Sequence, residues 1–135
     1  MGLAAAGIRA DYRLSHGALP HRIAGVGVAL CDEDTGCLVD EGDADGKIRR
    51  SSRRLWPQTE LAKAWIAQAE AGQAGAADEA RAALARLERH YLSHSVAGGW
   101  YDQFDRNGAS LVATIPASSF YHVLGTVAEA DQVLG

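Results

Sequence analysis

The sequence has 135 residues, enough for one domain with a buried core, and 47% of them are hydrophobic. Its formal net charge of −4 argues against nucleic acid or an anionic membrane as the main partner. No apolar run reaches the roughly 18 residues that a membrane-spanning helix needs, and the N-terminus lacks the basic flank of a secretion signal. We therefore expect a single cytoplasmic domain over residues 1–135.

The first part of the chain predicts a short helix, a hairpin and a loop. Residues 3–16 are rich in alanine and indicate a weak helix, whereas the apolar run 23–31 predicts a strand. The turn-forming residues 32–36 would let residues 37–41 pair with that strand. Glycine, aspartate and arginine dominate residues 42–53, which predicts a loop.

Helical spacing recurs in three later stretches, at 57–70, 78–94 and 118–134. Each begins with a residue suited to a helix start, namely Pro57 in the first position and Asp78 and Ser118 as N-caps. The predicted buried stripes are Leu61, Ala64, Trp65 and Gln68; then Ala80, Leu84, Leu87 and Tyr91; and finally Phe120, Val123, Leu124, Val127 and Leu134.

A second hairpin is predicted before the last helix. Residues 100–104 and 111–115 are short apolar stretches, and Asn107-Gly108 between them is a hairpin-turn signal. The sequence therefore predicts a mainly α fold with short β-hairpins in the connecting loops. Periodicity alone does not distinguish a toroid of helical hairpins from an ordinary helical domain.

His122 is the candidate for proton transfer, because histidine moves protons readily near neutral pH. With Ser118 as N-cap, His122 falls in the first helical turn, where the helix dipole disfavours an imidazolium. A neutral imidazole can take a proton from a carbon beside a carbonyl, as aldose–ketose isomerisation requires. On spacing alone, a surface or core histidine without such a role is the favoured interpretation.

A second candidate cluster is Arg-Leu-Trp-Pro-Gln-Thr-Glu at residues 54–60. A sugar pocket needs a flat apolar face and fixed polar groups for the hydroxyls. Trp56 can supply the face, Gln58 and Glu60 can supply donors and acceptors, and Arg54 can offset charge on an enediolate oxygen. A helix start with a buried tryptophan and solvated polar groups fits these residues equally well.

Three segments together resemble the C-terminal part of the N-acylglucosamine 2-epimerase family, which includes mannose isomerases. They are residues 54–60, the Trp-x-Asp-x-x-Asp-x-x-Gly pattern at 100–108, and Pro-Ala-Ser-Ser-Phe-Tyr-His at 116–122. The resemblance implies that His122 exchanges protons with a sugar. It also implies a set of sugar contacts, from Arg54, Trp56, Gln58 and Glu60.

The family fold is an (α/α)6 barrel of six helical hairpins, so the resemblance implies that this chain forms part of such a toroid. It is strongest over residues 53–134. The family's second proton-exchanging histidine lies upstream, beside a glutamate and a tryptophan, and residues 1–22 show no such motif. The expected function is that of a sugar isomerase or 2-epimerase, whether or not this chain is active in isolation. The alternative is a non-catalytic helical interaction module or truncated remnant.

The expected substrate is a monosaccharide, phosphorylated or not, and mannose–fructose interconversion is the favoured reaction. Helix faces that would pack on upstream hairpins of a toroid would be open, so we expect the isolated chain to self-associate or to be marginally stable.

No metal or cofactor is expected. Asp102, Asp105 and Asn107 depart from the spacing of a calcium-binding loop, so we expect them to form a turn at the pocket rim. His90 and His94 are four residues apart but lack a third ligand, which favours a solvated helix face.

Two other features leave alternatives open. Cys31 and Cys37 flank a predicted turn, so a disulfide is geometrically feasible, although free thiols are favoured without a secretion signal. The basic run at residues 49–54 could bind phosphate, but an exposed charge cluster in a loop is the favoured interpretation.

Overall fold

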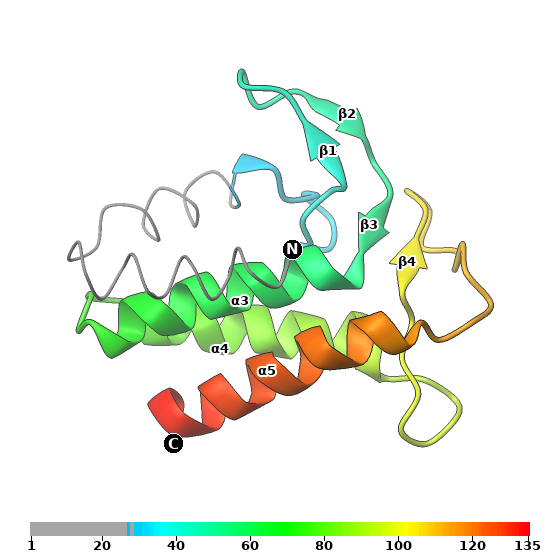
Figure 1. The fold of residues 1–135 in the computed structure, drawn as a ribbon. Helices are drawn as coiled ribbons and strands as arrows, with labels where there is room; N and C mark the ends of the chain where they lie inside the picture. Colours follow the sequence, from blue (N-terminus) through cyan, green and yellow to red (C-terminus); the bar gives the residue numbers. More distant parts are fainter. Residues whose placement is uncertain (1–26, 28) are drawn as a thin grey trace.

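The computed structural model describes Gly27 and residues 29–135, in which three helices lie side by side (Figure 1). They are α3 (Leu55–Glu70), α4 (Ala76–Leu87) with its π-helical continuation η1 (Glu88–Leu92), and α5 (Ala117–Leu134). The mainly α fold with short antiparallel strands is therefore confirmed for the described residues. That it belongs to a complete toroid stays a prediction, and the helix expected at 3–16 lies outside the described residues.

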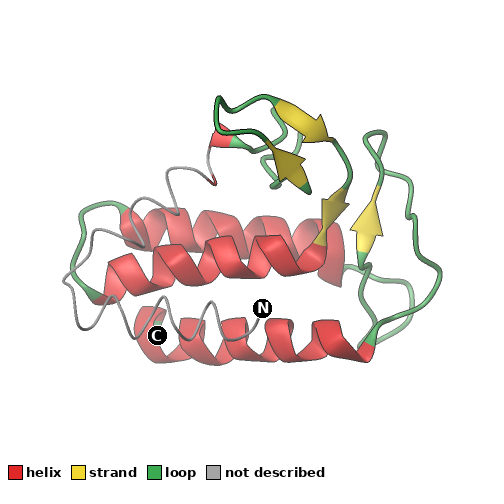
Figure 2. Ribbon diagram, turned by 45° about the horizontal axis from the view of Figure 1, so that its top comes forward, coloured by secondary structure: helices red, strands yellow, loops and turns green. Residues whose placement is uncertain are grey.

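The helices α3 and α5 begin at the same end of the molecule, where the strands gather, and α4 runs in the opposite direction (Figures 1 and 2). Helix α3 packs against both α4 and α5. Residues near the starts of α3 and α5 are therefore brought together, although about 60 residues separate them in the sequence.

Helix α3 begins two residues earlier than predicted. Arg54 is its N-cap, and Pro57 occupies the third helical position rather than the first. Proline is tolerated there because the first N–H groups of a helix lack an intrahelical acceptor. Leu55 is fully buried, and the predicted stripe is confirmed, since Leu61, Ala64 and Gln68 are buried and Trp65 is partly buried.

Helix α4 also begins earlier than predicted, after Gly75 with its positive φ of 78°. Asp78 is therefore not the N-cap but the third residue, where its charge still complements the positive end of the helix. Ala80, Leu87 and Tyr91 of the predicted stripe are buried and Leu84 is partly buried. Small buried side chains on both helices allow α3 and α4 to pack closely: Ala62, Ala67, Ala76, Ala80 and Ala83.

The prediction of Ser118 as the N-cap of α5 is wrong. Pro116 is the N-cap, and the backbone N–H of Ser119 donates to the Pro116 carbonyl at 3.0 Å. His122 consequently lies in the second turn of α5. The helix-dipole argument for a neutral imidazole does not carry over, because that effect fades beyond the first turn.

The predicted buried stripe of α5 is also wrong in part. Phe120, Leu124 and Val127 are each more than half exposed, at 52%, 55% and 51%. The residues that α5 buries are polar, Ser119 and Thr126, and Thr126 donates its hydroxyl hydrogen to the His122 carbonyl at 2.8 Å. Periodicity identified an apolar stripe but could not tell which face of α5 meets α3.

The first predicted hairpin is only partly present. Residues 23–26 lie outside the described residues; Gly27 and Ala29 are helical, and only Cys31 makes a bridge, to Leu38. A strand over residues 23–31 is thus wrong for the part described, because a short glycine-containing apolar run fits helix or strand equally. The turn between Cys31 and Leu38 is confirmed, with the N–H of Gly36 donating to the Asp32 carbonyl at 2.8 Å.

The stretch 42–53 is not merely a loop. It contains most of an antiparallel hairpin of β1 (Glu41–Gly42) and β2 (Ile48–Arg50). The carboxylate of Asp43 closes the turn, accepting from the backbone N–H groups of Asp45 and Lys47 at 3.1 and 2.9 Å. Such side-chain-to-backbone bonds are typical of aspartate in turns.

The second sheet joins distant parts of the chain. Strand β3 (Arg53–Arg54) pairs antiparallel with β4 (Gln103–Phe104), which places residues 103–104 directly beside the start of α3. The strand predicted at 111–115 is wrong, because only Ser110 bridges back to Phe104. The Asn107-Gly108 turn is confirmed, with Gly108 at a φ of 85°.

Four buried side chains form an apolar cluster: Cys37, Leu55, Leu87 and Tyr91. Trp100, Phe104 and Val123 are among the partly buried side chains that pack on it. None of the helices described is long and apolar enough to cross a membrane.

Candidate functional site

Three of the five predicted site side chains meet where α3 packs against α5. Nδ1 of His122 lies 2.9 Å from Oε1 of Glu60, and the rings of His122 and Trp56 have centroids 6.3 Å apart. Trp56 and Glu60 are four residues apart, so they share one face of α3. A base that acts on a sugar carbon must lie beside the groups that hold the sugar hydroxyls, which predicts that His122 lies near Trp56, Gln58 and Glu60. Its proximity to Trp56 and Glu60 is confirmed, and the roles of these residues stay predictions.

The contact with Glu60 determines which ring nitrogen of His122 carries the hydrogen. An ionised carboxylate can only accept, so Nδ1–H of His122 donates to Glu60, and in the neutral ring Nε2 keeps its lone pair. The side chains of His122 and Glu60 are 13% and 19% exposed, shielded but not sealed off. A histidine oriented by a carboxylate in this way is suited to act as a general base.

Two further side chains complete the cluster and were not singled out from the sequence. Nζ of Lys63 lies 3.4 Å from the same Oε1 of Glu60 and 5.8 Å from the centroid of the Tyr121 ring. The Tyr121 ring in turn lies edge-on to His122, with centroids 5.1 Å apart. The available signal was the spacing of three between Glu60 and Lys63, which brings opposite charges together on a helix.

Gln58 and Arg54 are not drawn into this cluster by any contact described. Both amide hydrogens of Gln58 donate to backbone carbonyls, those of Leu38 and Arg54, each at 2.9 Å, and its oxygen accepts from the Leu38 N–H at 2.7 Å. Gln58 thus ties the first hairpin to the start of α3. The Arg54 side chain is 45% exposed and forms an ion pair with Asp40 at 3.7 Å.

Asp102 holds the starts of α3 and α5 together. Its backbone carbonyl accepts from the N–H of Leu55, the first residue of α3, at 2.8 Å. Its carboxylate accepts a short hydrogen bond from the hydroxyl of Ser119 in the first turn of α5. This double connection fixes the relative position of the two helices and hence of Glu60 and His122. Sequence reasoning placed Asp102 in the rim turn but did not foresee this contact.

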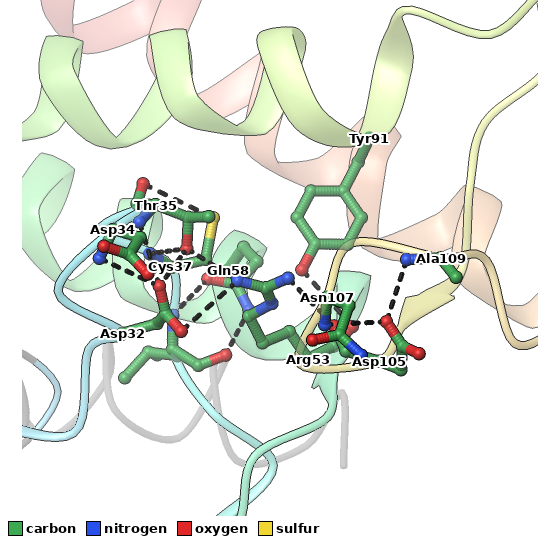
Figure 3. A network of polar contacts seen from close by, with 11 residues as sticks. Asp32, Asp34, Thr35, Cys37, Arg53, Gln58, Tyr91, Asp105, Asn107 and Ala109 are labelled. Atoms are coloured by element: carbon green, nitrogen blue, oxygen red, sulfur yellow. Dashed lines mark hydrogen bonds and ion pairs between the residues drawn. The ribbon is translucent and has the colours of Figure 1, made fainter.

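The buried side chain of Arg53, in β3, contacts two loops that are distant in the sequence (Figure 3). The guanidinium of Arg53 donates to the Thr35 hydroxyl at 3.0 Å and to the Asp105 carbonyl at 2.9 Å, and pairs with the Asp32 carboxylate at 3.4 Å. Tyr91 donates its hydroxyl hydrogen to the Arg53 carbonyl at 3.3 Å, and burial raises the pKa of Tyr91 far above its usual range. Arg53 thereby links both hairpin loops to the strand that leads into α3.

The turn around Asn107-Gly108 is confirmed, whereas its place at the rim of a sugar pocket stays a prediction. Oδ1 of Asp105 accepts from the backbone N–H groups of Asn107 and Ala109, each at 2.8 Å, so this carboxylate closes the turn. Nδ1 of His94 accepts from the Val96 N–H at 3.0 Å. Within the described part of the chain, no three histidine, cysteine or acidic side chains are grouped as a metal site would require.

The basic run is largely neutralised by neighbouring carboxylates. Besides buried Arg53, Arg49 pairs with Asp43 at 2.7 Å and Arg50 with Glu41 at 3.8 Å. These pairs support a charge cluster rather than a phosphate site.

A separate hollow of about 1100 Å³ lies between the turn at residues 32–35, strand β2 and residues 106–108. None of the five predicted site residues lines it.

Both cysteines are free thiols. The bridge pairs Cys31 with Leu38, so neighbouring Cys37 faces the opposite side of the hairpin. Burial raises the pKa of both thiols, which keeps them protonated near neutral pH.

Comparison with known proteins identifies the family of this chain. The family model described as N-acylglucosamine 2-epimerase (GlcNAc 2-epimerase) matches residues 23–126, well over half of the chain. A curated relative, "Mannose-6-phosphate isomerase" of Rhizobium meliloti (strain 1021), is 34% identical over 94 residues, or 67% of this chain. The match spans only 24% of that relative, and no solved structure matches significantly. The chain, whose Trp56, Glu60 and His122 meet at one helix contact, belongs to the N-acylglucosamine 2-epimerase family.

Proposed function

We propose that this chain carries part of the sugar site of an isomerase or 2-epimerase, in which His122 moves the proton at carbon 2. The observation that carries the proposal is the 2.9 Å contact between Nδ1 of His122 and Glu60. This contact leaves Nε2 of the neutral ring available as a base.

The reaction follows from that assignment. Nε2 of His122 takes the hydrogen of carbon 2 as a proton, and the electron pair left behind forms an enediolate with the carbonyl at carbon 1. Return of a proton to carbon 1, with the hydroxyl hydrogen of oxygen 2 passing to oxygen 1 and oxygen 2 becoming the carbonyl, gives the ketose. Return to the opposite face of carbon 2 gives the epimer. A base with a pKa near the working pH is effective in both reactions.

The neighbouring groups supply binding. Trp56 presents a partly buried aromatic ring beside His122, suited to the C–H face of a sugar. The half-exposed guanidinium of Arg54 can approach an enediolate oxygen. For Gln58, the backbone contacts support a positioning role for α3 rather than the direct sugar contact expected from the sequence.

Mannose–fructose interconversion is the favoured reaction. The name of the Rhizobium meliloti relative adds the 6-phosphate of mannose as a candidate substrate. Both forms therefore belong in the test.

A non-catalytic helical module is the second candidate. It is favoured by the exposed apolar side chains of α5, namely Phe120, Leu124 and Val127.

Solvent-deuterium exchange distinguishes the two candidates. The chain is incubated in D₂O with mannose, fructose, glucose, N-acetylmannosamine or their 6-phosphates, and deuterium at carbons 1 and 2 is followed by NMR. A chimera in which this chain replaces the matched stretch of the Rhizobium relative is tested in parallel, because the chain spans about a quarter of that protein. The proposal requires exchange with at least one sugar in the chain or the chimera.

Substitutions assign the roles. We expect His122→Ala to abolish exchange while sugar binding, followed by saturation-transfer NMR, persists. Trp56→Ala should instead weaken binding. His94→Ala, which replaces a histidine outside the cluster, serves as the control and should leave both unchanged. Undiminished exchange in His122→Ala would remove the catalytic assignment.

A further inference from the structure

Lys63 is a buried cation at the contact between α3 and α5. Its side chain is only 8% exposed, and its Nζ lies 3.4 Å from Oε1 of Glu60. Lysine is rarely buried unless it is paired, because removing an ammonium group from water is costly. The position therefore needs an explanation beyond the i,i+3 ion pairs common on helix surfaces.

Helix α5 leaves room for this ammonium group. A Cβ atom added at Gly125 would lie 3.3 Å from Nζ of Lys63, tighter than ordinary van der Waals contact. Gly125 lies in the interior of α5, where glycine costs about 1 kcal/mol relative to alanine. It also follows His122 by three residues, so the lysine lies one helical layer beyond the histidine.

Glu60 thus has two partners on one oxygen, the Nδ1–H of His122 and the ammonium of Lys63. Without the lysine, a poorly solvated carboxylate beside the imidazole would favour the charged imidazolium, which has no lone pair to act as a base. With the lysine, the carboxylate can orient the ring while its charge is balanced. Two aromatic rings, those of Trp56 and Tyr121, also lie beside His122.

We propose that Lys63 is a positioning residue of the proton-transfer site, whose ammonium balances the charge of Glu60 and so limits how strongly that carboxylate favours the charged form of His122. That a neutral ring is needed, as the base at carbon 2, rests on the proposed function. The electrostatic coupling of Lys63 to His122 does not, and it can be measured in the chain without any turnover.

The experiment measures the ratio of charged to neutral His122 at pH 7 from the ¹⁵N chemical shifts of the labelled imidazole. Lys63→Met removes the charge and keeps the side-chain length, and we expect the ratio to rise by a factor of about ten. A change of that size is expected when a like charge that shares Oε1 of Glu60 with the ring is removed from a partly screened site. Arg81→Met is the matched control, because Arg81 also pairs with an acid at i,i+3, Asp78, but on an exposed face of α4. It should leave the ratio unchanged.

A second variant tests the same coupling without changing any charge. Gly125→Ala crowds Nζ of Lys63, so we expect the ratio to rise in the same direction but less than in Lys63→Met. Because alanine favours the helix more than glycine does, a raised ratio in this variant does not come from a loss of helical structure. An unchanged ratio in Lys63→Met, with His122 signals still dispersed as in a folded chain, would overturn the proposal.

The two proposals fail in different ways. Exchange at carbon 2 together with an unchanged ratio would leave the sugar function standing and remove the role of Lys63. A raised ratio without any exchange in the chain or the chimera would support the role of Lys63 and remove the proposed sugar function.

Discussion

Helices α3 and α5 run in the same direction and contribute to the same cluster, yet they differ in how they are held. Ten of the sixteen residues of α3 are buried, because it has α4 on one side and α5 on another. Only Ser119 and Thr126 are buried among the eighteen residues of α5, and Phe120, Leu124 and Val127 face outward. The cluster of Glu60 and His122 lies at the contact between a well-packed helix and a weakly packed one.

This difference indicates a division of labour. Helix α3 provides stability and carries Trp56, Glu60 and Lys63 on a fixed support. Helix α5 supplies His122, packs Val123 on the apolar cluster and is aligned by the hydrogen bond from Ser119 to Asp102. Changes in α3 should therefore affect folding, whereas changes on the outer face of α5 should affect association.

The largest expected effect comes from a matched pair of leucines. Leu55 of α3 is 0% exposed and Leu124 of α5 is 55% exposed. We expect Leu55→Ala to lower the free energy of unfolding by about 3–5 kcal/mol, because it leaves a cavity in the core. Leu124→Ala should change it by less than about 0.5 kcal/mol. Urea unfolding followed by circular dichroism measures both, and equal losses would refute the contrast between the helices.

A second pair compares arginines at the strands that lead into α3. Arg53→Met removes a guanidinium that is 5% exposed from three acceptors, and we expect a loss of about 2–3 kcal/mol, since Asp32 is left partly solvated. Arg50→Met breaks an exposed pair with Glu41 and should cost less than about 1 kcal/mol. If the two variants lose the same free energy of unfolding, Arg53 does not organise these loops.

The outer face of α5 should control association. Phe120→Gln combined with Val127→Gln replaces two exposed apolar side chains with polar ones. We expect the double variant to lower the fraction of self-associated chain in sedimentation experiments, with little change in stability. A wild-type chain that stays monomeric at high concentration would contradict the expected self-association.

The smallest expected effect is on the free energy of unfolding at acid pH. Burial alone would raise the pKa of Asp32, but hydrogen bonds from Thr35 and the charge of Arg53 outweigh it and hold the pKa below the usual value of an aspartate. The stability contributed by ionised Asp32 is thus present above about pH 4 and is lost as the pH falls through the lowered pKa. We expect Asp32→Asn to lose less stability than wild type between pH 4 and pH 2. Parallel acid titrations of unfolding would contradict this.

Much of the helical layout could be predicted from the sequence, because strong periodicity and turn residues act locally. The stripes of α3 and α4 and the Asn107-Gly108 turn are of this kind. Helix starts were displaced by one to two residues, since Gly75 and Pro116 replaced the expected polar caps. Such ends depend on where the preceding chain arrives, which periodicity does not encode.

Long-range pairing was the part that could not be predicted. Strand β4 forms its sheet with the distant β3 and meets its sequence neighbour only at the bridge from Phe104 to Ser110, and no local signal predicts the partner at β3. The proximity of His122 to Glu60 could be predicted on chemical grounds, because a base must lie beside the groups that hold its substrate. The contacts of Lys63 and Asp102 became visible only once α3 and α5 were placed together. The rotation of α5 that exposes Leu124 also depends on packing between helices and could not be predicted from the local sequence.

The most direct test of the account is the tautomer of His122 in the isolated chain. Long-range ¹H–¹⁵N correlation spectra, recorded at a pH where the ring is neutral, report which nitrogen carries the hydrogen. We predict that it resides on Nδ1 in the wild-type chain, because Glu60 accepts from it, and that Glu60→Met abolishes this preference. A wild-type ring with its hydrogen on Nε2 would contradict the account, because Nε2 could not then serve as the base.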